Sequence, residues 1–150
     1  MRGPIEGWRG DGNSTLIFGE FLEQHGGHLW TCDLDPEATE RSRFVTRPYS
    51  AHITYVTGDS IDFLAGFDRP IDLLYLDSYD TPRKGNAGAP QRHNLRELKA
   101  ALPHVSTGGI ILLDDNWYPN GGKTRLSKTY LLEKGWLCLL DSQQSLWIRS

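Results

Sequence analysis

Short apolar segments that alternate with helical segments constrain the fold of this chain more than any other feature. The apolar segments span residues 28–35, 53–60, 71–80 and 108–116, and a helical pattern follows each of them. Parallel strands need such crossover segments, and near-continuous apolar runs such as LLYL and IILL indicate strands that are buried on both faces. The sequence therefore predicts an α/β fold with a doubly wound, mostly parallel sheet.

The predicted helices follow the glycine-rich start and the apolar segments. The first spans residues 13–26, where Phe18, Phe21, Leu22 and His25 have helical spacing and two glycines end the pattern. The others span residues 36–46, 61–67, about 91–105 and 124–134. The last two apolar runs, 136–142 and 145–150, are too close for a parallel crossover, so they predict a C-terminal antiparallel hairpin.

Length, composition and charge limit the class of protein. The 150 residues suit about one domain, and 38% hydrophobic with 23% charged residues is ordinary globular composition. A net charge of −3, with lysine and arginine scattered among acids, argues against a nucleic-acid binder. No apolar run reaches the ~18 residues of a membrane span. We expect a cytoplasmic protein with a small-molecule partner and no nucleic acid or membrane, as a monomer or a homo-oligomer.

Acidic residues recur where the predicted strands end. In doubly wound sheets the carboxyl ends of the strands line the ligand crevice, so these side chains are predicted to meet at one surface. They are Asp33, Asp35, Asp59, Asp77, Asp80, Asp114 and Asp115.

A glycine-rich turn opens the first helix. Gly10 and Gly12 allow close approach of the backbone to a ligand, and Asn13, Ser14 and Thr15 supply a helix N-terminus and hydroxyls that suit an anionic group. In the alternative interpretation, Asn13 or Ser14 simply caps the helix.

Two further strand ends suit a nucleoside. Asp33 follows the strand after the glycine-rich turn and can accept both hydroxyls of a ribose, whereas Asp35 is better placed to cap the next helix. Asp59 and Ser60 end the next strand and can hold an adenine edge, although Ser60 is equally suited to be a helix cap.

The ordered set of motifs resembles a known enzyme family. The motifs are G-x-S-T at 12–15, CDLD at 32–35, GDS at 58–60, YLDSYD at 75–80 and LLDDN at 112–116. Their order and spacing resemble class I S-adenosylmethionine-dependent methyltransferases, above all the metal-assisted small-molecule O-methyltransferases of the catechol and macrocin types. The resemblance covers residues 10–150. It implies a Rossmann-like sheet, S-adenosylmethionine as cofactor, and cofactor binding by Gly12, Ser14, Thr15, Asp33, Asp59 and Ser60.

The same resemblance implies a divalent cation such as Mg²⁺. Its ligands would be Asp77 with Asp115 and Asn116, or Asp114 if the macrocin-like pairing applies. Such a hard cation prefers several oxygen ligands, and it lowers the pKa of a bound hydroxyl. The alternative is that these side chains only cap backbone groups at the strand ends.

The general base is not inherited from the family. Where the catechol type has a lysine, three positions after the first metal-binding aspartate, this chain has Asp80. Asp80 or His93 is therefore the predicted base, and with Asp77 these form the predicted catalytic set. For His93 the alternative is an ordinary surface histidine.

Two nucleotide-binding motifs are incomplete. The GGKT sequence at 121–124 resembles the end of a phosphate-binding loop, but the required first glycine is Trp117, so we interpret it as a turn and a helix start. The dehydrogenase fingerprint is broken because Thr15 stands at its third glycine.

The family's first, central strand is predicted to be missing. It should end in E-x-G before the G-x-S-T turn, but only eleven residues precede Gly12 and they contain no apolar run. The chain is then a single methyltransferase-like domain over 1–150 that is N-terminally truncated, or one that takes a strand from a partner or closes the gap by sliding the sheet. The alternative function is a non-catalytic nucleoside-binding or interaction module.

Overall fold

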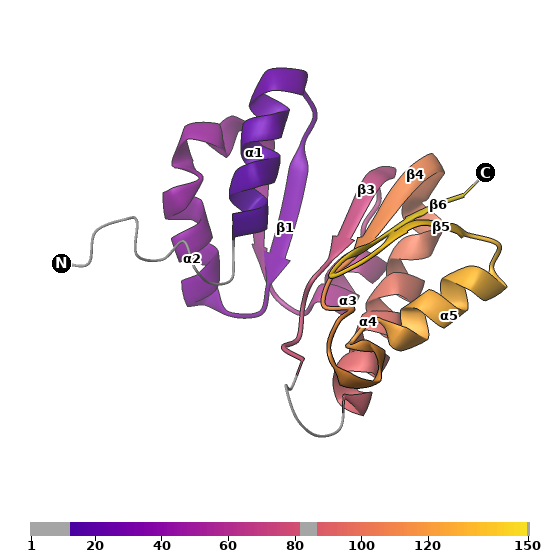
Figure 1. The fold of residues 1–150 in the computed structure, drawn as a ribbon. Helices are drawn as coiled ribbons and strands as arrows, with labels where there is room; N and C mark the ends of the chain where they lie inside the picture. Colours follow the sequence, from indigo (N-terminus) through magenta and orange to yellow (C-terminus); the bar gives the residue numbers. More distant parts are fainter. Residues whose placement is uncertain (1–12, 82–86, 150) are drawn as a thin grey trace. The chain divides into compact units, whose positions relative to one another are not determined.

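The computed structural model of the chain describes residues 13–81 and 87–149 (Figure 1). Helices and strands alternate along these residues as predicted, which confirms the α/β fold class. The chain divides into two compact units, Met1–Asp59 and Ser60–Ser150, which we call unit 1 and unit 2 and describe separately. The prediction of a single domain over 1–150 stays a prediction.

Unit 1 contains one pair of parallel strands with its helices. Strands β1 and β2 pair from Leu29 with Ile53 to Asp33 with Thr57. The elements are α1 (Asn13–His25), β1 (Leu29–Asp33), α2 (Pro36–Val45), the 3-10 helix η1 (Arg47–His52) and β2 (Ile53–Thr57). Only η1 was not predicted.

Local sequence signals explain where these helices begin and end. The Asp35 side chain accepts a hydrogen bond of 2.9 Å from the backbone N–H of Glu37, and Pro36 occupies the first position of α2. This is the capping role predicted for Asp35. Helix α1 ends at His25, and Gly26 follows with φ at 78°, a left-handed conformation that glycine adopts without strain.

The apolar core of unit 1 is small. Among residues 13–59 only one hydrophobic side chain is buried, that of Ile53, at 6% exposure. The other buried positions are Thr15, Gly19, Thr39 and Thr46. Many of the large apolar side chains on the helices of this unit are exposed, so they contribute little to its core.

Unit 2 contains a four-stranded sheet in the order β3-β4-β6-β5. Strands β3 and β4 are parallel, whereas β6 is antiparallel to both β4 and β5, which confirms the C-terminal hairpin. The elements are α3 (Ser60–Ala65), β3 (Ile71–Leu76), α4 (Gly88–Ala101), η2 (Leu102–His104), β4 (Val105–Leu113), η3 (Pro119–Gly121), α5 (Arg125–Glu133), β5 (Leu137–Asp141) and β6 (Ser145–Ile148).

Helices α3, α4 and α5 lie against one face of this sheet (Figure 1). Alternate residues of β3 and β4 point into the core there, as the period of two in a strand requires. The buried core consists of Leu64, Leu74, Leu76, Leu98, Ala101, Ile111, Leu113, Leu131, Trp136 and Trp147. All of these residues belong to unit 2, so most of the apolar burial in the described residues is there.

Two boundaries and the sheet connectivity differ from the sequence expectation. Helix α4 begins at Gly88 rather than near Gln91, and β4 begins at Val105 rather than Gly108. The described strands form two sheets, β1-β2 and β3-β4-β6-β5, rather than one. The segment in which a strand is predicted to be missing, residues 1–12, lies outside the described residues. None of the described helices has the length and apolar character needed to cross a membrane.

The uneven cores predict uneven stability. We expect backbone amides of β1 and β2 to exchange hydrogen at least about tenfold faster than those of β3 and β4, because local opening of unit 1 exposes little apolar surface. Hydrogen–deuterium exchange with mass spectrometry measures this directly. Equal protection of the β1-β2 and β3-β4 ladders would contradict the prediction.

Candidate functional site

Three of the predicted acids meet at the ends of β3 and β4. Because these strands are parallel and Leu76 pairs with Leu113, the residues that follow them emerge at the same edge of the sheet. Carboxylate oxygens of Asp77, Asp114 and Asp115 lie within 4.8 Å of one another. We call these three residues the carboxylate cluster.

Hydroxyl and amide groups donate hydrogen bonds to the oxygens of the carboxylate cluster. The Tyr75 hydroxyl donates to Oδ2 of Asp114 at 2.5 Å, and its oxygen also lies 3.2 Å from Oδ2 of Asp77. The Gln144 amide donates to Oδ2 of Asp114 at 2.8 Å, and the Thr81 hydroxyl lies 3.3 Å from Oδ2 of Asp115. Burial and the hydrogen bond to Asp114 raise the pKa of Tyr75 far above its usual range, so its hydroxyl stays protonated.

A buried lysine completes the cluster. The Nζ atom of Lys123 lies 2.8 Å from Oδ1 of Asp77 and 3.1 Å from Oδ2 of Asp115, and the residue is 1% exposed. Burial alone would lower the pKa of Lys123, but the hydrogen bond and charge of Asp77, with those of Asp115, outweigh it and raise the pKa. Burial also raises the pKa of Asp77, although Lys123 opposes that change.

Lys123 is not among the residues predicted from the sequence. The GGKT segment is a turn before a helix, as predicted, since α5 begins at Arg125, but no role was predicted for its lysine. One signal was available: Lys123 is the first basic residue after the adjacent Asp114 and Asp115. Acids packed together need a nearby positive charge or donor.

The glycines of the turn explain how the lysine reaches the acids. Gly122 has φ at +59°, and a Cβ atom there would lie 1.7 Å from the carbonyl oxygen of Asp115. The turn is also held by a 2.9 Å hydrogen bond from the Gln91 amide to the Gly122 carbonyl. This close approach places Lys123 directly against the chain that carries Asp115.

Asn116, a predicted metal ligand, has a structural partner. Its side-chain oxygen accepts a hydrogen bond from the Thr124 hydroxyl, and its backbone N–H donates to the carbonyl of Gln143 at 2.9 Å. These bonds connect the end of β4 to the start of α5 and to the β5-β6 turn. The role of Asn116 as a ligand stays a prediction.

A second polar network surrounds a buried glutamate on α4. Oε1 of Glu97, a residue that is 1% exposed, accepts hydrogen bonds from the hydroxyls of Ser60 and Ser78, both at 2.5 Å. Nε2 of His93 lies 3.4 Å from the same oxygen and 3.3 Å from the Ser60 hydroxyl. Glu97 was not predicted as a site residue. It directly precedes Leu98 of the apolar stripe, and a charged residue at such a position is ordinarily expected to be exposed to solvent.

The two alternative bases differ in their surroundings. His93 lies in the second turn of α4, not the first, because the helix begins earlier than expected, and its side chain is 19% exposed. His93 is thus partly buried, and the choice between a base and an ordinary surface histidine stays a prediction. Its ring also lies 5.3 Å from that of Tyr79. Asp80 is exposed and is not part of the carboxylate cluster.

The predicted cofactor residues lie mostly in unit 1. Gly10 and Gly12 are outside the described residues, whereas Asn13, Ser14 and Thr15 form the first turn of α1 as predicted. Their contacts with a cofactor stay predictions.

The remaining cofactor candidates lie at the ends of β1 and β2. Asp33 is exposed, and its Oδ1 accepts a 2.8 Å hydrogen bond from the backbone N–H of Asp35. The backbone N–H of Gly58 donates to the Asp33 carbonyl at 2.9 Å, which holds the two strand ends together. Asp59 is exposed too, and the Ser60 hydroxyl donates a hydrogen bond to Glu97.

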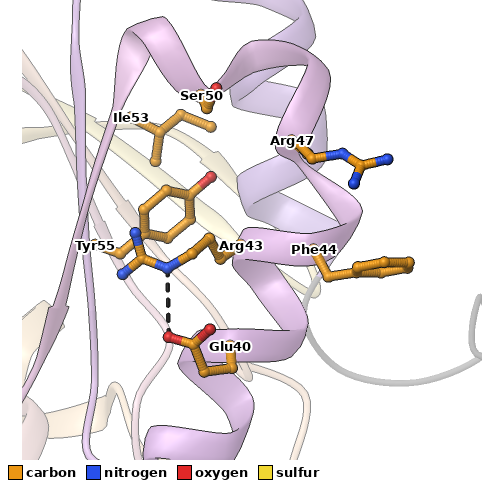
Figure 2. A pocket seen from close by; sticks show the side chains of 7 residues that line it. All are labelled: Glu40, Arg43, Phe44, Arg47, Ser50, Ile53 and Tyr55. Carbon is orange, nitrogen blue, oxygen red and sulfur yellow. Dashed lines mark ion pairs between the residues drawn. The ribbon is translucent and has the colours of Figure 1, made fainter.

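A separate hollow of about 430 Å³ lies in unit 1 between α2, η1 and β2. Its lining is Glu40, Arg43, Phe44, Arg47, Ser50, Ile53 and Tyr55 (Figure 2). Arg43 pairs with Glu40 at 3.4 Å and stacks 4.6 Å from the centre of the Tyr55 ring. The hollow contains no predicted site residue, so we do not include it in the candidate site.

A match to a known protein family identifies the domain that contains the carboxylate cluster. Residues 9–116 match the model of a family described as a methyltransferase domain. The chain belongs to this family.

Solved structures support the fold of this methyltransferase. The O-methyltransferase NovP superposes with a TM-score of 0.68 at 16% identity, covering 93% of this chain and 68% of NovP. The Podospora anserina methyltransferase PaMTH1, solved with S-adenosylhomocysteine (SAH), has a TM-score of 0.67 at 18% identity, with 91% and 66% covered. A protein from Clostridium thermocellum described as a putative rRNA-methylase has a TM-score of 0.61 at 13% identity, with 91% and 81% covered. No curated protein matches the sequence.

The carboxylate cluster of the methyltransferase does not fit the implied divalent cation as it stands. Three carboxylates this close are a plausible donor set in number. However, the Lys123 ammonium already binds one oxygen each of Asp77 and Asp115, and the protein's own donors take Oδ2 of Asp114. The cation at this cluster is the one that the chain itself provides.

Proposed function

We propose that this cytoplasmic methyltransferase transfers the methyl group of S-adenosylmethionine to a hydroxyl group of a small molecule. The observation that carries the proposal is the environment of Asp77. Its side chain is 45% exposed just after β3, Lys123 Nζ lies 2.8 Å from its Oδ1, and the Tyr75 hydroxyl lies 3.2 Å from its Oδ2. The family match, the O-methyltransferase NovP and the SAH-bound PaMTH1 support the reaction and the cofactor.

Asp77 acts as the general base in this proposal. The acceptor oxygen attacks the methyl carbon, the new O–C bond forms as the C–S bond of the sulfonium breaks, and the hydroxyl proton passes to Asp77. Burial raises the pKa of Asp77, which makes its carboxylate a stronger base than an ordinary aspartate. SAH and the methyl ether are the products. Asp80 and His93 are the alternative bases.

Cofactor binding is assigned to the strand ends and the first helix. Asp33 would accept the ribose hydroxyls, Asp59 and Ser60 would hold the adenine edge, and the first turn of α1 would approach the polar end of the cofactor. Asp35 contributes through the capped start of α2, which fixes the backbone beside Asp33.

Charge favours a small acceptor over RNA. The chain carries a net charge of −3, and the cluster adds carboxylates at the reacting edge, where a polyanion would be repelled. One structural neighbour is described as a putative rRNA-methylase, so RNA belongs among the acceptors to be tested.

The metal-assisted form of the proposal uses the same residues. Asp77, Asp114, Asp115 and Asn116 would hold a Mg²⁺ ion, which supplies Lewis-acid activation of the acceptor hydroxyl when bound. The position of Lys123 argues against this form, and the steps above do not need it.

Calorimetric titration of SAH into the full chain tests the cofactor assignment. We expect saturable binding that weakens roughly tenfold to a hundredfold in Asp33→Ala, because a charged hydrogen bond to the ribose is lost. Asp68→Ala is the matched control, since Asp68 is also an exposed aspartate but lies between α3 and β3. No binding of SAH by the unaltered chain would overturn the proposal.

Transfer of an isotopically labelled methyl group separates the enzyme from the alternative, a non-catalytic nucleoside-binding module. We expect label to enter members of a panel of small phenols and sugars and not an RNA pool. Binding of SAH without transfer to any acceptor would favour the module.

A further inference from the structure

We propose that the Lys123 ammonium is the resident cation of the carboxylate cluster, so that the methyltransferase needs no divalent metal. The catalytic part of this inference rests on the proposed function, because it concerns how Asp77 is held for methyl transfer. The occupancy of the cluster by Lys123 does not depend on any reaction.

The contacts of Nζ are the first argument. It lies 2.8 Å from Oδ1 of Asp77 and 3.1 Å from Oδ2 of Asp115, so it bridges residues that follow two different strands. A divalent ion shared by these residues would compete with the ammonium for the same oxygens. Asp114 offers little in exchange, because the Tyr75 hydroxyl and the Gln144 amide both donate to its Oδ2.

The backbone of Lys123 is fixed where it is. Gly122 meets the Asp115 carbonyl so closely that no side chain fits there, and the Gln91 amide holds the Gly122 carbonyl. Thr124, the next residue, is buried and donates to Asn116. The backbone of Lys123 is therefore anchored on both sides, within reach of the carboxylate cluster.

Burial fixes the side chain as well. Lys123 is 1% exposed, and an ammonium moved from these carboxylates into the apolar core would lose its partners without gaining water. The ion pair is therefore the stable position of this charge.

The consequence for the site is a positioning role. Lys123 holds Oδ1 of Asp77. Oδ2, which lies 3.2 Å from the Tyr75 hydroxyl on this 45% exposed side chain, is then the oxygen that accepts the proton from the acceptor. A divalent metal would instead bind the acceptor oxygen itself. Lys123 acts through Asp77, and its single positive charge offsets part of the negative charge of the three carboxylates.

Metal titration of the full chain, dialysed against EDTA, tests the inference. Mn²⁺ is added and free Mn²⁺ is followed by electron paramagnetic resonance. We expect no saturable site in the unaltered chain. Lys123→Met removes the charge while retaining the bulk of the side chain, and we expect Mn²⁺ to bind it at least about a hundredfold more tightly, the scale set by repulsion between charges a few ångströms apart.

Lys128→Met is the matched control. Lys128 lies on α5 and pairs with Asp141 at 2.6 Å, so its loss removes the same charge without touching the cluster. We expect no gain of Mn²⁺ binding there. An equal gain in both variants, or no gain in a folded Lys123→Met, would overturn the proposal.

Measurements on the unaltered chain test the proposal even if Lys123→Met fails to fold. One tightly bound Mn²⁺ per chain, or methyl transfer that stops in EDTA and returns with Mg²⁺, would overturn the metal-free cluster while leaving methyl transfer intact. Absence of SAH binding would overturn the proposed function and leave the Mn²⁺ result valid. Methyl transfer that is unchanged by EDTA supports both.

Discussion

Asp77→Asn is expected to lower the kcat of methyl transfer by roughly a hundredfold to ten-thousandfold, the usual contribution of a general base. Asparagine preserves the shape of the side chain but cannot take the acceptor's proton. Binding of SAH should not change, because Asp77 is not among the residues assigned to the cofactor. Single-turnover transfer of a labelled methyl group, with calorimetry of SAH, measures both quantities.

The matched control for this variant is Asp72→Asn, because Asp72 is an exposed aspartate on the same strand, β3. Its rate should stay near that of the unaltered chain. If Asp80→Asn or the His93 variant loses as much activity while Asp77→Asn does not, Asp77 is not the base.

The pH dependence gives a second readout of the same assignment. The rate of methyl transfer should be maximal above the pKa of Asp77 in the folded protein. It should fall as the pH drops through that value, because the base must be deprotonated. Burial raises this pKa, so the acid limb should lie at a higher pH than an ordinary aspartate would give. Asp77→Asn should remove that limb from the residual activity.

Gly122→Ala is expected to reduce the free energy of unfolding by roughly 3–5 kcal/mol, which combines overpacking with a left-handed backbone that alanine disfavours. The new methyl group would lie 1.7 Å from the Asp115 carbonyl oxygen, so the turn or the end of β4 must move. Lys123 would move with it and release the cluster. Urea denaturation measures the loss.

Gly135→Ala provides the comparison, because Gly135 has φ at +79° but a Cβ atom there would meet nothing within 4 Å. Gly135→Ala should therefore lower the free energy of unfolding only by the cost of the left-handed backbone, about 1 kcal/mol. Equal losses in the two variants would mean that the contact between Gly122 and Asp115 contributes nothing to stability.

The sequence predicted the order of helices and strands well because its signals are local. An apolar run such as LLYL between helical segments favours a strand, and a gap of two or three residues before the last strand leaves only an antiparallel hairpin. Asp35 was identified as a cap for the same reason: its partner, the backbone of Glu37, is two residues away. The prediction that Asp77, Asp114 and Asp115 meet needed only the parallel order of the strands.

The parts that sequence reasoning missed depend on contacts between distant segments. Lys123 contacts Asp77 across 46 residues, and Glu97 binds Ser60 across 37. No periodicity in the sequence reports such contacts, and both residues are of a type that is usually exposed. Their burial follows from how tightly Gly122 packs and from which face of α4 meets the sheet.

The small core of unit 1 has a consequence for how this protein responds to its cofactor. Residues 13–59 contain a single buried hydrophobic side chain, that of Ile53, and one pair of strands, so this part of the chain has little stability of its own. The residues assigned to the cofactor in the proposed function lie mostly on this segment, so each tenfold excess of ligand over its dissociation constant would add about 1.4 kcal/mol to its folded form. Cellular supply of the cofactor would then set the lifetime of the protein against proteolysis as well as its rate of turnover.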